Sequence, residues 1–238
     1  PTTSTRAMGV SLWSRVLDFV SPRLCAVCGS RLSVTEHALC SACCLRLPRT
    51  GFCLRPYDNP VAQAFWGQAD VERAASFFYF EPHSEVSRMI YSLKYKGRPD
   101  IGVALGRLAA GEFMAAGFFD GVDVIVPVPL ARKRLRERGY NQSAEVAAGV
   151  SSLTGIPVDE RSVCRKAFKT SQTKLGRWER LGNVSGLFEV RRQERLLGKH
   201  VLLVDDVFTT GATVMACASA VAAVPGTTVS IMTLGFTK

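Results

Sequence analysis

The chain has 238 residues, of which 47% are hydrophobic and 21% are charged, and its 30 Lys and Arg against 20 Asp and Glu give a net charge of +10. No apolar run reaches the roughly 18 residues that a membrane-spanning helix needs. Because the N-terminus also lacks the apolar core of a signal peptide, membrane insertion is excluded and a cytoplasmic location is expected. A chain of this length can bury one α/β core and carry a small accessory module.

Six of the eight cysteines lie between residues 25 and 53. Two Cys-x-x-Cys pairs, Cys25 with Cys28 and Cys40 with Cys43, have the spacing of the two knuckles of a tetrahedral Zn²⁺ site. A disulfide framework is the alternative, which a reducing compartment disfavours. A module this short cannot build its own core, so we expect zinc to stabilise its fold. His37 and Cys44 are weaker candidates as substitute zinc ligands. Cys53 is interpreted as an unpaired, structural thiol.

Strand and helix patterns follow this module. An apolar, aromatic-rich run over residues 74–80 predicts a strand. Apolar residues at helical spacing then predict one helix that ends at Gly97 and a second that closes near Gly117. The buried positions expected in these helices are Val86, Ile90, Leu93, Ile101, Leu105 and Leu108. The basic run Lys94–Arg98 at the end of the first helix either balances the helix dipole or contacts a ligand.

Residues 122–128 are predicted as the first strand of the α/β core, stopped by Pro127-Val128-Pro129. Five cations in seven residues then form a basic loop, which opens a helix with Val146, Val150 and Leu153 on its buried side. Ligands of α/β proteins bind at the carboxyl edge of the parallel sheet, so we expect this loop to bind pyrophosphate or another polyanion. The residues expected in that role are Arg132, Lys133, Arg136, Arg138, Asn141 and Gln142.

A polar segment over residues 165–183 has little periodicity, which is typical of lids, binding loops or disordered linkers. We favour a mobile lid, because the segment is rich in side chains that bind phosphate. These are Arg165, Lys166, Thr170, Gln172, Arg180 and Asn183. Strand character resumes over residues 186–190, and residues 227–234 are predicted as the last strand.

The most informative stretch runs from Val201 to Thr213. Four apolar residues predict a buried parallel strand that ends at Asp205 and Asp206, and a Thr/Gly run then leads into a helix. The unpaired N–H groups of that helix favour an anion, and Gly211 lets the backbone come close to it. The expected 5′-phosphate loop comprises Thr209, Thr210, Gly211, Ala212 and Thr213. The two acids suit ribose hydroxyls or a bound Mg²⁺ one sugar length away.

This stretch resembles the motif of type I phosphoribosyltransferases that binds 5-phosphoribosyl 1-pyrophosphate (PRPP). In that motif four hydrophobic residues and two acids precede a Thr-Thr-Gly-Ala/Ser-Thr loop, and every position is filled here. The alternative is an ordinary strand–turn–helix whose acids only cap the helix. A cap needs one acid and no Thr-rich loop, which favours the PRPP interpretation.

Several motifs, taken in order, resemble the ComF/ComFC family of competence-associated proteins over residues 12–233. They are the cysteine pairs, Leu93-Lys94-Tyr95-Lys96-Gly97, Pro127-Val128-Pro129, Arg138-Gly139-Tyr140-Asn141-Gln142, the polar segment and the acid–threonine stretch. The resemblance implies an α/β, type I phosphoribosyltransferase-like parallel-sheet domain with a small N-terminal zinc-binding module. It also implies PRPP chemistry with Mg²⁺, and a part in handling single-stranded DNA in natural transformation, with a competence helicase or uptake channel as partner. The chain departs from the pattern at Cys53, which has lost the second cysteine of its pair.

We therefore expect residues 1–60 to hold the four-cysteine module and residues 61–238 to form the phosphoribosyltransferase-like domain. The first functional hypothesis is a phosphoribosyltransferase, which transfers the phosphoribosyl group from PRPP to an unknown acceptor, with Asp205 and Asp206 stabilising the developing positive charge. The alternative is a non-catalytic protein that binds single-stranded nucleic acid through its basic face, its zinc module and its aromatic residues. A zinc-stabilised scaffold for partner proteins is a third interpretation.

Overall fold

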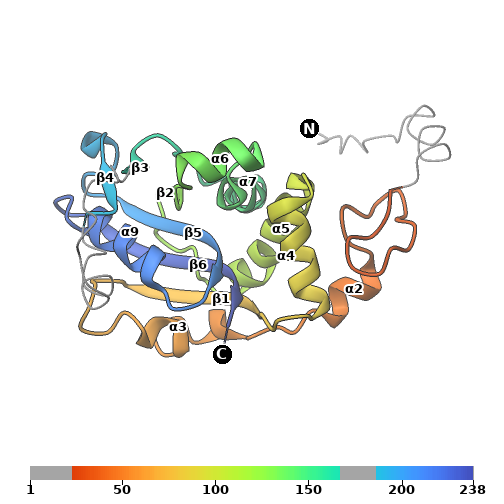
Figure 1. The fold of residues 1–238 in the computed structure, drawn as a ribbon. Helices are drawn as coiled ribbons and strands as arrows, with labels where there is room; N and C mark the ends of the chain where they lie inside the picture. The colour runs from red at the N-terminus through yellow and green to blue at the C-terminus, as the bar shows by residue number, and fades with distance from the viewer. Residues whose placement is uncertain (1–22, 167–185, 238) are drawn as a thin grey trace, which may run out of the picture.

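The computed structural model describes residues 23–166 and 186–237 of the chain. At its centre lies a parallel sheet of four strands in the order β1-β6-β5-β2 (Figure 1). The strands are β1 (Arg73–Tyr79), β6 (Thr228–Phe236), β5 (His200–Phe208) and β2 (Val124–Pro127). Most residues of these strands are buried, as in parallel sheets that helices cover. The predicted class, an α/β protein with a parallel sheet, is confirmed.

Two predictions about these strands are wrong. β2 is not the first strand of the core, because β1 pairs in parallel with β6 in the same sheet. β5 does not end before the two acids: Asp205 and Val207 are still paired with β6, and the strand continues to Phe208. Asp205 and Asp206 therefore have strand geometry, which directs their side chains to opposite faces of the sheet.

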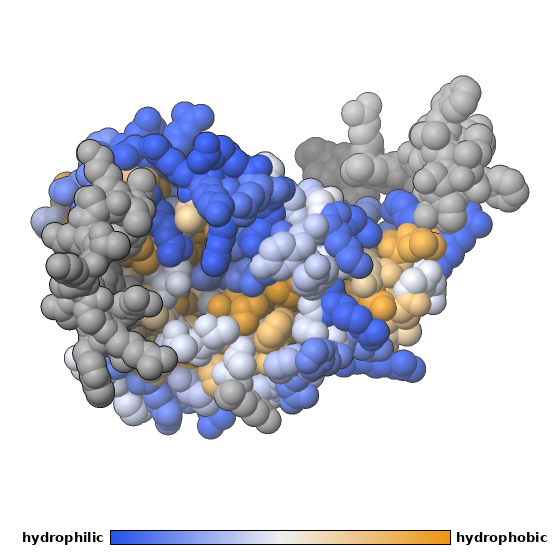
Figure 2. Space-filling view, viewed as in Figure 1, coloured by the Kyte–Doolittle hydropathy of each residue, from blue (hydrophilic) through white to orange (hydrophobic). Residues whose placement is uncertain are grey.

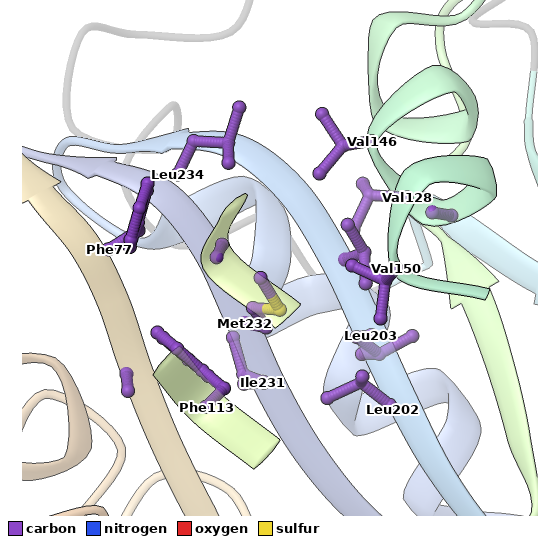
Figure 3. Packing of buried hydrophobic residues seen from close by; sticks show 14 of the residues in the cluster. Phe77, Phe113, Val128, Val146, Val150, Leu202, Leu203, Ile231, Met232 and Leu234 are labelled. Atoms are coloured by element: carbon purple, nitrogen blue, oxygen red, sulfur yellow. The ribbon is translucent and has the colours of Figure 1, made fainter. Parts of the chain in front are cut away.

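The longer helices are α4 (Glu85–Tyr95), α5 (Pro99–Ala115), α7 (Gln142–Thr154) and α9 (Ala212–Ala222). The buried positions predicted for the first two are confirmed at Val86, Ile90, Leu93, Ile101 and Leu105, whereas Leu108 is only half-buried. Figure 3 shows Val146 and Val150 of α7 beside Leu203 of β5 and Val128, which directly follows β2. On α5, Phe113 packs against Phe77 of β1 with 6.5 Å between the ring centroids.

Helices α5 and α7 approach each other closely because glycine lies on both. A Cβ at Gly106 would collide with the carbonyl oxygen of Val146, and one at Gly149 would collide with that of Val103. This close approach holds the first turn of α7 against the sheet, where Gln142 and Ser143 are buried.

The basic stretch after β2 is a short helix, α6 (Arg132–Arg138), and not the predicted loop. It ends at Gly139, whose φ of 83° requires glycine, and Asn141 then caps α7 by accepting a hydrogen bond from the Ser143 N–H. No α6 residue is buried, and Figure 2 shows hydrophilic side chains gathered over this helix. Leu153 was predicted to be buried in α7 but is 41% exposed in its last turn.

A small antiparallel pair stands apart from the main sheet. It consists of β3 (Val163–Arg165) and β4 (Phe188–Val190), with the 3₁₀ turn η2 (Gln193–Arg195) after it. Arg165 is paired with Phe188, and the Lys166 N–H donates to the Leu187 carbonyl. The other residues of the predicted lid lie outside the described residues, so the lid stays a prediction: Thr170, Gln172, Arg180 and Asn183.

Three short elements precede β1: α2 (Ser41–Arg46), η1 (Phe52–Leu54) and α3 (Pro60–Gln63). Phe52 of η1 packs edge-on against Tyr79 and Phe236, and Asn59 caps α3 while donating to the Ala74 carbonyl of β1. In Figure 1, α4 and α5 stand between the sheet and the segment that ends in α2. The domain boundary at residue 60 stays a prediction.

Among the described residues, no helix combines the length and the apolar character needed to cross a membrane.

Candidate functional site

A polar cleft of about 160 Å³ opens at the carboxyl ends of β2 and β5. The carboxyl edge of a parallel sheet is where α/β proteins bind ligands, as expected for this chain. The cleft brings together segments that are distant in the sequence: the end of α4, the turn after β2, α6, the start of α7, β3 and the β5–α9 connection. Its polar and charged lining residues are Lys94, Tyr95, Arg134, Arg138, Gln142, Arg165, Asp205, Asp206, Thr209, Thr210 and Thr213.

The two acids have different partners. Asp205 Oδ1 accepts hydrogen bonds from Ser143 Oγ at 2.8 Å and from the Asp206 N–H at 2.9 Å. Asp206 is only 5% exposed, and its Oδ2 lies 2.9 Å from the ammonium of Lys94. Lys94 thus neutralises Asp206, while Asp205 is held in place by neutral donors.

The environment of Asp205 disfavours its charged form. Burial, and after it the neighbouring carboxylate of Asp206, raise the pKa of Asp205 to about 7, against smaller opposing effects of the hydrogen bonds and of Lys94. A divalent cation or a row of sugar hydroxyls at this position would compensate the buried charge. Carboxylate oxygens are ligands that Mg²⁺ prefers, so the acid pair fits the cation that the family resemblance implies.

Residues 209–213 follow the end of β5 at Phe208 and run into α9, whose first two residues are Ala212 and Thr213. Gly211 has a φ of 74°, and a Cβ there would come within 2.6 Å of the Phe208 ring, so glycine is required both by its conformation and by the space. The loop places the first N–H groups of α9, an eleven-residue helix, at the edge of the cleft. Free N–H groups and the helix dipole favour a phosphate at this position.

The residues predicted to bind pyrophosphate separate into two groups. Arg138 and Gln142 line the cleft, and the Arg138 guanidinium donates to the Gln142 side chain. Lys133 and Arg136 do not line the cleft, and Arg132 lines a neighbouring cavity of about 430 Å³. Asn141 acts as the cap of α7 and donates to the Val128 carbonyl. The helical form of α6 explains this division, because a helix turns successive side chains to different sides.

Sequence reasoning missed three cleft contacts. Arg134 was not among the predicted pyrophosphate ligands, although its i, i+4 spacing to Arg138 places both on one face of α6. Ser143 resembles an ordinary first-turn serine, and nothing local signals its bond to Asp205. Lys94 was predicted either to balance the helix dipole or to contact a ligand, and it pairs with Asp206.

The four predicted zinc ligands come together in the structure. The Sγ atoms of Cys25, Cys28, Cys40 and Cys43 all lie within 4.8 Å of one another, and Cys28 Sγ is 3.7 Å from Cys40 Sγ. A tetrahedral zinc with Zn–S bonds of about 2.3 Å places its sulfurs about 3.8 Å apart, so this group can hold Zn²⁺.

Backbone geometry supports the same assignment. Gly29 has a φ of 73° in the turn after the first pair, and its N–H donates to the Cys25 carbonyl. The Cys40 N–H donates to Cys25 Sγ at 3.3 Å, which joins the two cysteine turns. Cys53 is buried in η1, where burial raises the pKa of its thiol, in keeping with a structural residue. His37 and Cys44 do not belong to the four-sulfur group.

These features define the class of the protein. It is an α/β protein whose sheet carries an acid pair and a loop suited to a phosphate at its carboxyl edge, and a four-cysteine module precedes the sheet in the sequence. The chain is 30% identical to the DNA utilization protein YhgH of Escherichia coli K12 over 204 residues, which covers 81% of this chain and 88% of the relative. It is 27% identical to Competence protein F of Haemophilus influenzae, over 79% of this chain and 86% of the relative. The chain belongs to the ComF family, which includes these proteins.

No protein-family model matches the chain. Among solved structures, it is similar to the glutamine PRPP amidotransferase of B. subtilis in complex with ADP and GMP, with a TM-score of 0.41 and 20% identity. That alignment covers 60% of this chain and 30% of the amidotransferase.

Proposed function

We propose that the chain binds PRPP with Mg²⁺ in the cleft at the carboxyl edge of the sheet, and that it transfers the 5-phosphoribosyl group to an acceptor with release of pyrophosphate. The observation that carries the proposal is the arrangement around the cleft. A helix N-terminus with a glycine turn, two adjacent acids and three arginines face one cavity of about 160 Å³. This distribution matches the charge distribution of a sugar that carries a phosphate at one end and a pyrophosphate at the other.

The binding mode follows from the placement of charge. The 5′-phosphate binds the N–H groups and hydroxyls of residues 209–213, and the ribose hydroxyls donate to Asp205 and Asp206. Arg134, Arg138 and Arg165 bind the pyrophosphate, because guanidinium groups bind phosphate oxygens bidentately. Arg132, Lys133 and Arg136 contribute to the positive field around the entrance without touching the ligand.

The chemistry that these residues support is cleavage of the bond between the anomeric carbon and pyrophosphate. Positive charge develops on the ribose as this bond breaks, and the carboxylates next to it stabilise that charge. The arginines stabilise the negative charge on the departing pyrophosphate. Asp205 and Asp206 would hold Mg²⁺, which would supply further charge neutralisation for the departing pyrophosphate. Lys94 pairs with Asp206 at 2.9 Å and fixes the position of its carboxyl group in the cleft.

The biological setting proposed is the use of DNA taken up by the cell. It rests on the names of the relatives, DNA utilization protein and Competence protein F. A competence helicase or an uptake channel stays the proposed class of protein partner.

The test is calorimetric titration of the zinc-loaded protein with PRPP and Mg²⁺, with ribose 5-phosphate as the comparison ligand. PRPP should bind more tightly than ribose 5-phosphate, because only PRPP reaches the arginines. Asp205→Asn together with Asp206→Asn should weaken PRPP binding ten-fold or more, since each lost charge-assisted hydrogen bond is worth about 1.5–3 kcal/mol. The exposed Asp70→Asn is the matched control and should bind as the wild type. Unaltered PRPP affinity in the double variant would contradict the proposal.

A second candidate function, binding of single-stranded nucleic acid, is favoured by α6. Its five cations occupy seven residues, and none of its residues is buried. Lys133, whose ammonium lies 4.0 Å from Glu137, and Arg136 are exposed outside the cleft. In this position they can bind phosphates of a strand that passes over this helix. Asp205→Asn with Asp206→Asn should leave this binding intact or improve it, because the change removes negative charge.

A further inference from the structure

A second cavity, of about 510 Å³, lies between α4 and the first cysteine turn and is separate from the function proposed above. We call it the α4 groove. Its lining combines two exposed tyrosines, several basic side chains and the two residues between Cys25 and Cys28. The described residues that line it are Ala26, Val27, Phe80, His83, Ser87, Arg88, Ile90, Tyr91, Ser92, Lys94, Tyr95 and Lys96.

The tyrosines form the main feature of this groove. Tyr91 and Tyr95 are one helical turn apart on α4, with their ring centroids 4.9 Å apart. Tyr91 is 54% exposed and Tyr95 is 65% exposed, although an aromatic ring gains most by burial. The apolar stripe of α4 lies elsewhere, on Val86, Met89, Ile90 and Leu93, so the pair is not needed for packing of the helix.

Cations flank both rings. Lys96 Nζ lies 6.0 Å from the centroid of Tyr91, and the Arg138 guanidinium lies 5.1 Å from that of Tyr95. Arg88 also lines the groove, and its guanidinium lies 3.9 Å from the carboxylate of the exposed Glu85, a long contact. Among the described lining residues there is no carboxylate, so the electrostatic potential of the groove favours an anion.

Exposed aromatic faces next to cations have a specific complement. Unpaired nucleobases stack on tyrosine, while Lys and Arg bind the phosphates that the bases carry. We propose that the α4 groove binds a nucleotide, with the base stacked on Tyr91 and Tyr95 and the phosphate bound by Arg88 and Lys96. A free mononucleotide and one residue of a single strand have this chemistry in common, and the experiment below separates them.

The groove adjoins the cleft, because Lys94 and Tyr95 line both. Tyr91, Arg88 and Lys96 line only the groove. Variants at Tyr91 therefore test the groove without changing a residue that faces the proposed PRPP site. The proposal for the groove does not depend on whether PRPP binds in the cleft.

The experiment uses the full-length, zinc-loaded protein and fluorescence anisotropy of a labelled oligo-dT strand, with dTMP as unlabelled competitor. Tyr91→Ala should weaken binding of the strand about ten-fold, in line with the loss of one stacked base. Tyr91→Phe should retain binding, because the ring remains and only the hydroxyl is lost. Tyr57→Ala removes another tyrosine that is 58% exposed and lines neither cavity, so it should bind as the wild type.

The competitor identifies the source of the base. If dTMP displaces the strand and Tyr91→Ala binds dTMP more weakly, the groove is a mononucleotide site. If Tyr91→Ala weakens binding of the strand and dTMP does not compete, the groove is a site for the polymer. Equal strand and dTMP affinities of the wild type and Tyr91→Ala would overturn the proposal, as would Tyr91→Phe behaving like Tyr91→Ala. PRPP titration of Tyr91→Ala keeps the two proposals apart. Loss of nucleotide binding with unchanged PRPP binding supports the groove, whereas wild-type protein that binds nucleotide but no PRPP overturns only the proposed function.

Discussion

The carboxyl group of Asp205 costs the protein stability at a position where the proposed function needs a charge. It lies in a strand of the buried sheet, directly before a second acid, and the side chain that donates to it is the neutral Ser143. An acid in such surroundings lowers the stability of the protein when it ionises. Functional groups often lower the stability of a protein while no ligand is bound. A ligand that compensates the charge of Asp205 therefore explains why an acid occupies this position.

This cost should depend on pH. The pKa of Asp205 is raised by burial and by Asp206 to about 7, above its value in the unfolded chain of about 3.9. The stabilising contribution of the protonated group is therefore complete below about pH 4 and is lost as the pH rises toward 7 and above. Asp205→Asn removes the titration, so at pH 8 the free energy of unfolding should exceed that of the wild type by about 1–3 kcal/mol.

Urea unfolding at pH 8 and at pH 4 measures this difference, and the gain should be close to zero at the lower pH. Asp70→Asn, at an exposed acid, should unfold like the wild type at both values. A gain of the same size at pH 4 would show that the variant stabilises the protein by some means other than the charge of Asp205.

At the scale of elements, the close contact of α5 with α7 positions the cleft residues of α7. Gly149→Ala introduces a Cβ that collides with the Val103 carbonyl on α5, and backbone cannot move away as a flexible side chain can. We expect this variant to lose about 1–3 kcal/mol of unfolding free energy, the usual cost of overpacking. Gly111→Ala is the matched control on α5, because the nearest atom to its Cβ is Leu153 Cδ2 at 4.0 Å. That change should stabilise the protein by about 0.5–1 kcal/mol, as alanine does in a helix interior.

Thermal or urea unfolding of both glycine variants gives the comparison. If Gly149→Ala were as stable as the wild type, α5 and α7 would have to move apart without loss of unfolding free energy, which would contradict the prediction. The PRPP affinity of this variant gives a second measure of the position of α7.

Elements with strong local patterns were predictable from the sequence. The helix that carries Leu93, the strand before Asp205 and the two cysteine knuckles each follow from periodicity or spacing that the sequence displays. The helical form of α6 was missed because its five cations lack an apolar stripe, and helix periodicity is then invisible. The membership of β1 in the main sheet was missed for another reason: pairing with β6 joins residues more than 150 positions apart, and no local signal reports it.

The cleft shows the same division between local and distant information. The loop from Thr209 to Thr213 and the acid pair were predicted because they are contiguous. The contacts of Asp206 with Lys94 and of Asp205 with Ser143 join positions far apart in the chain, and sequence reasoning could not supply them. Of the basic run after β2, the sequence predicted the charge but not which side chains the helix turns toward the cleft.

At the scale of the whole molecule, the net charge of +10 is unevenly distributed. Hydrophilic residues gather over α6, which also supplies Arg134 and Arg138 to the cleft, and the α4 groove adds Arg88 and Lys96 without a carboxylate among its described lining residues. These surfaces adjoin one another, because Tyr95 lines both cavities and the Arg138 guanidinium lies over its ring. A single-stranded nucleic acid could therefore contact α6 and the groove together.

Such a strand would release counterions as its phosphates are neutralised. For single strands, each phosphate contact contributes about −0.7 to the slope of log affinity against log salt concentration. If about six basic residues contact phosphates, the slope should therefore be about −4. Anisotropy titrations of an oligo-dT strand over a salt series give this slope. Replacing the two α6 residues outside the cleft, Lys133→Gln with Arg136→Gln, should reduce it by about 1.4 and leave PRPP affinity near that of the wild type. A slope near zero would exclude the strand-binding candidate, and an unchanged slope in the double variant would move the contacts off this face of α6.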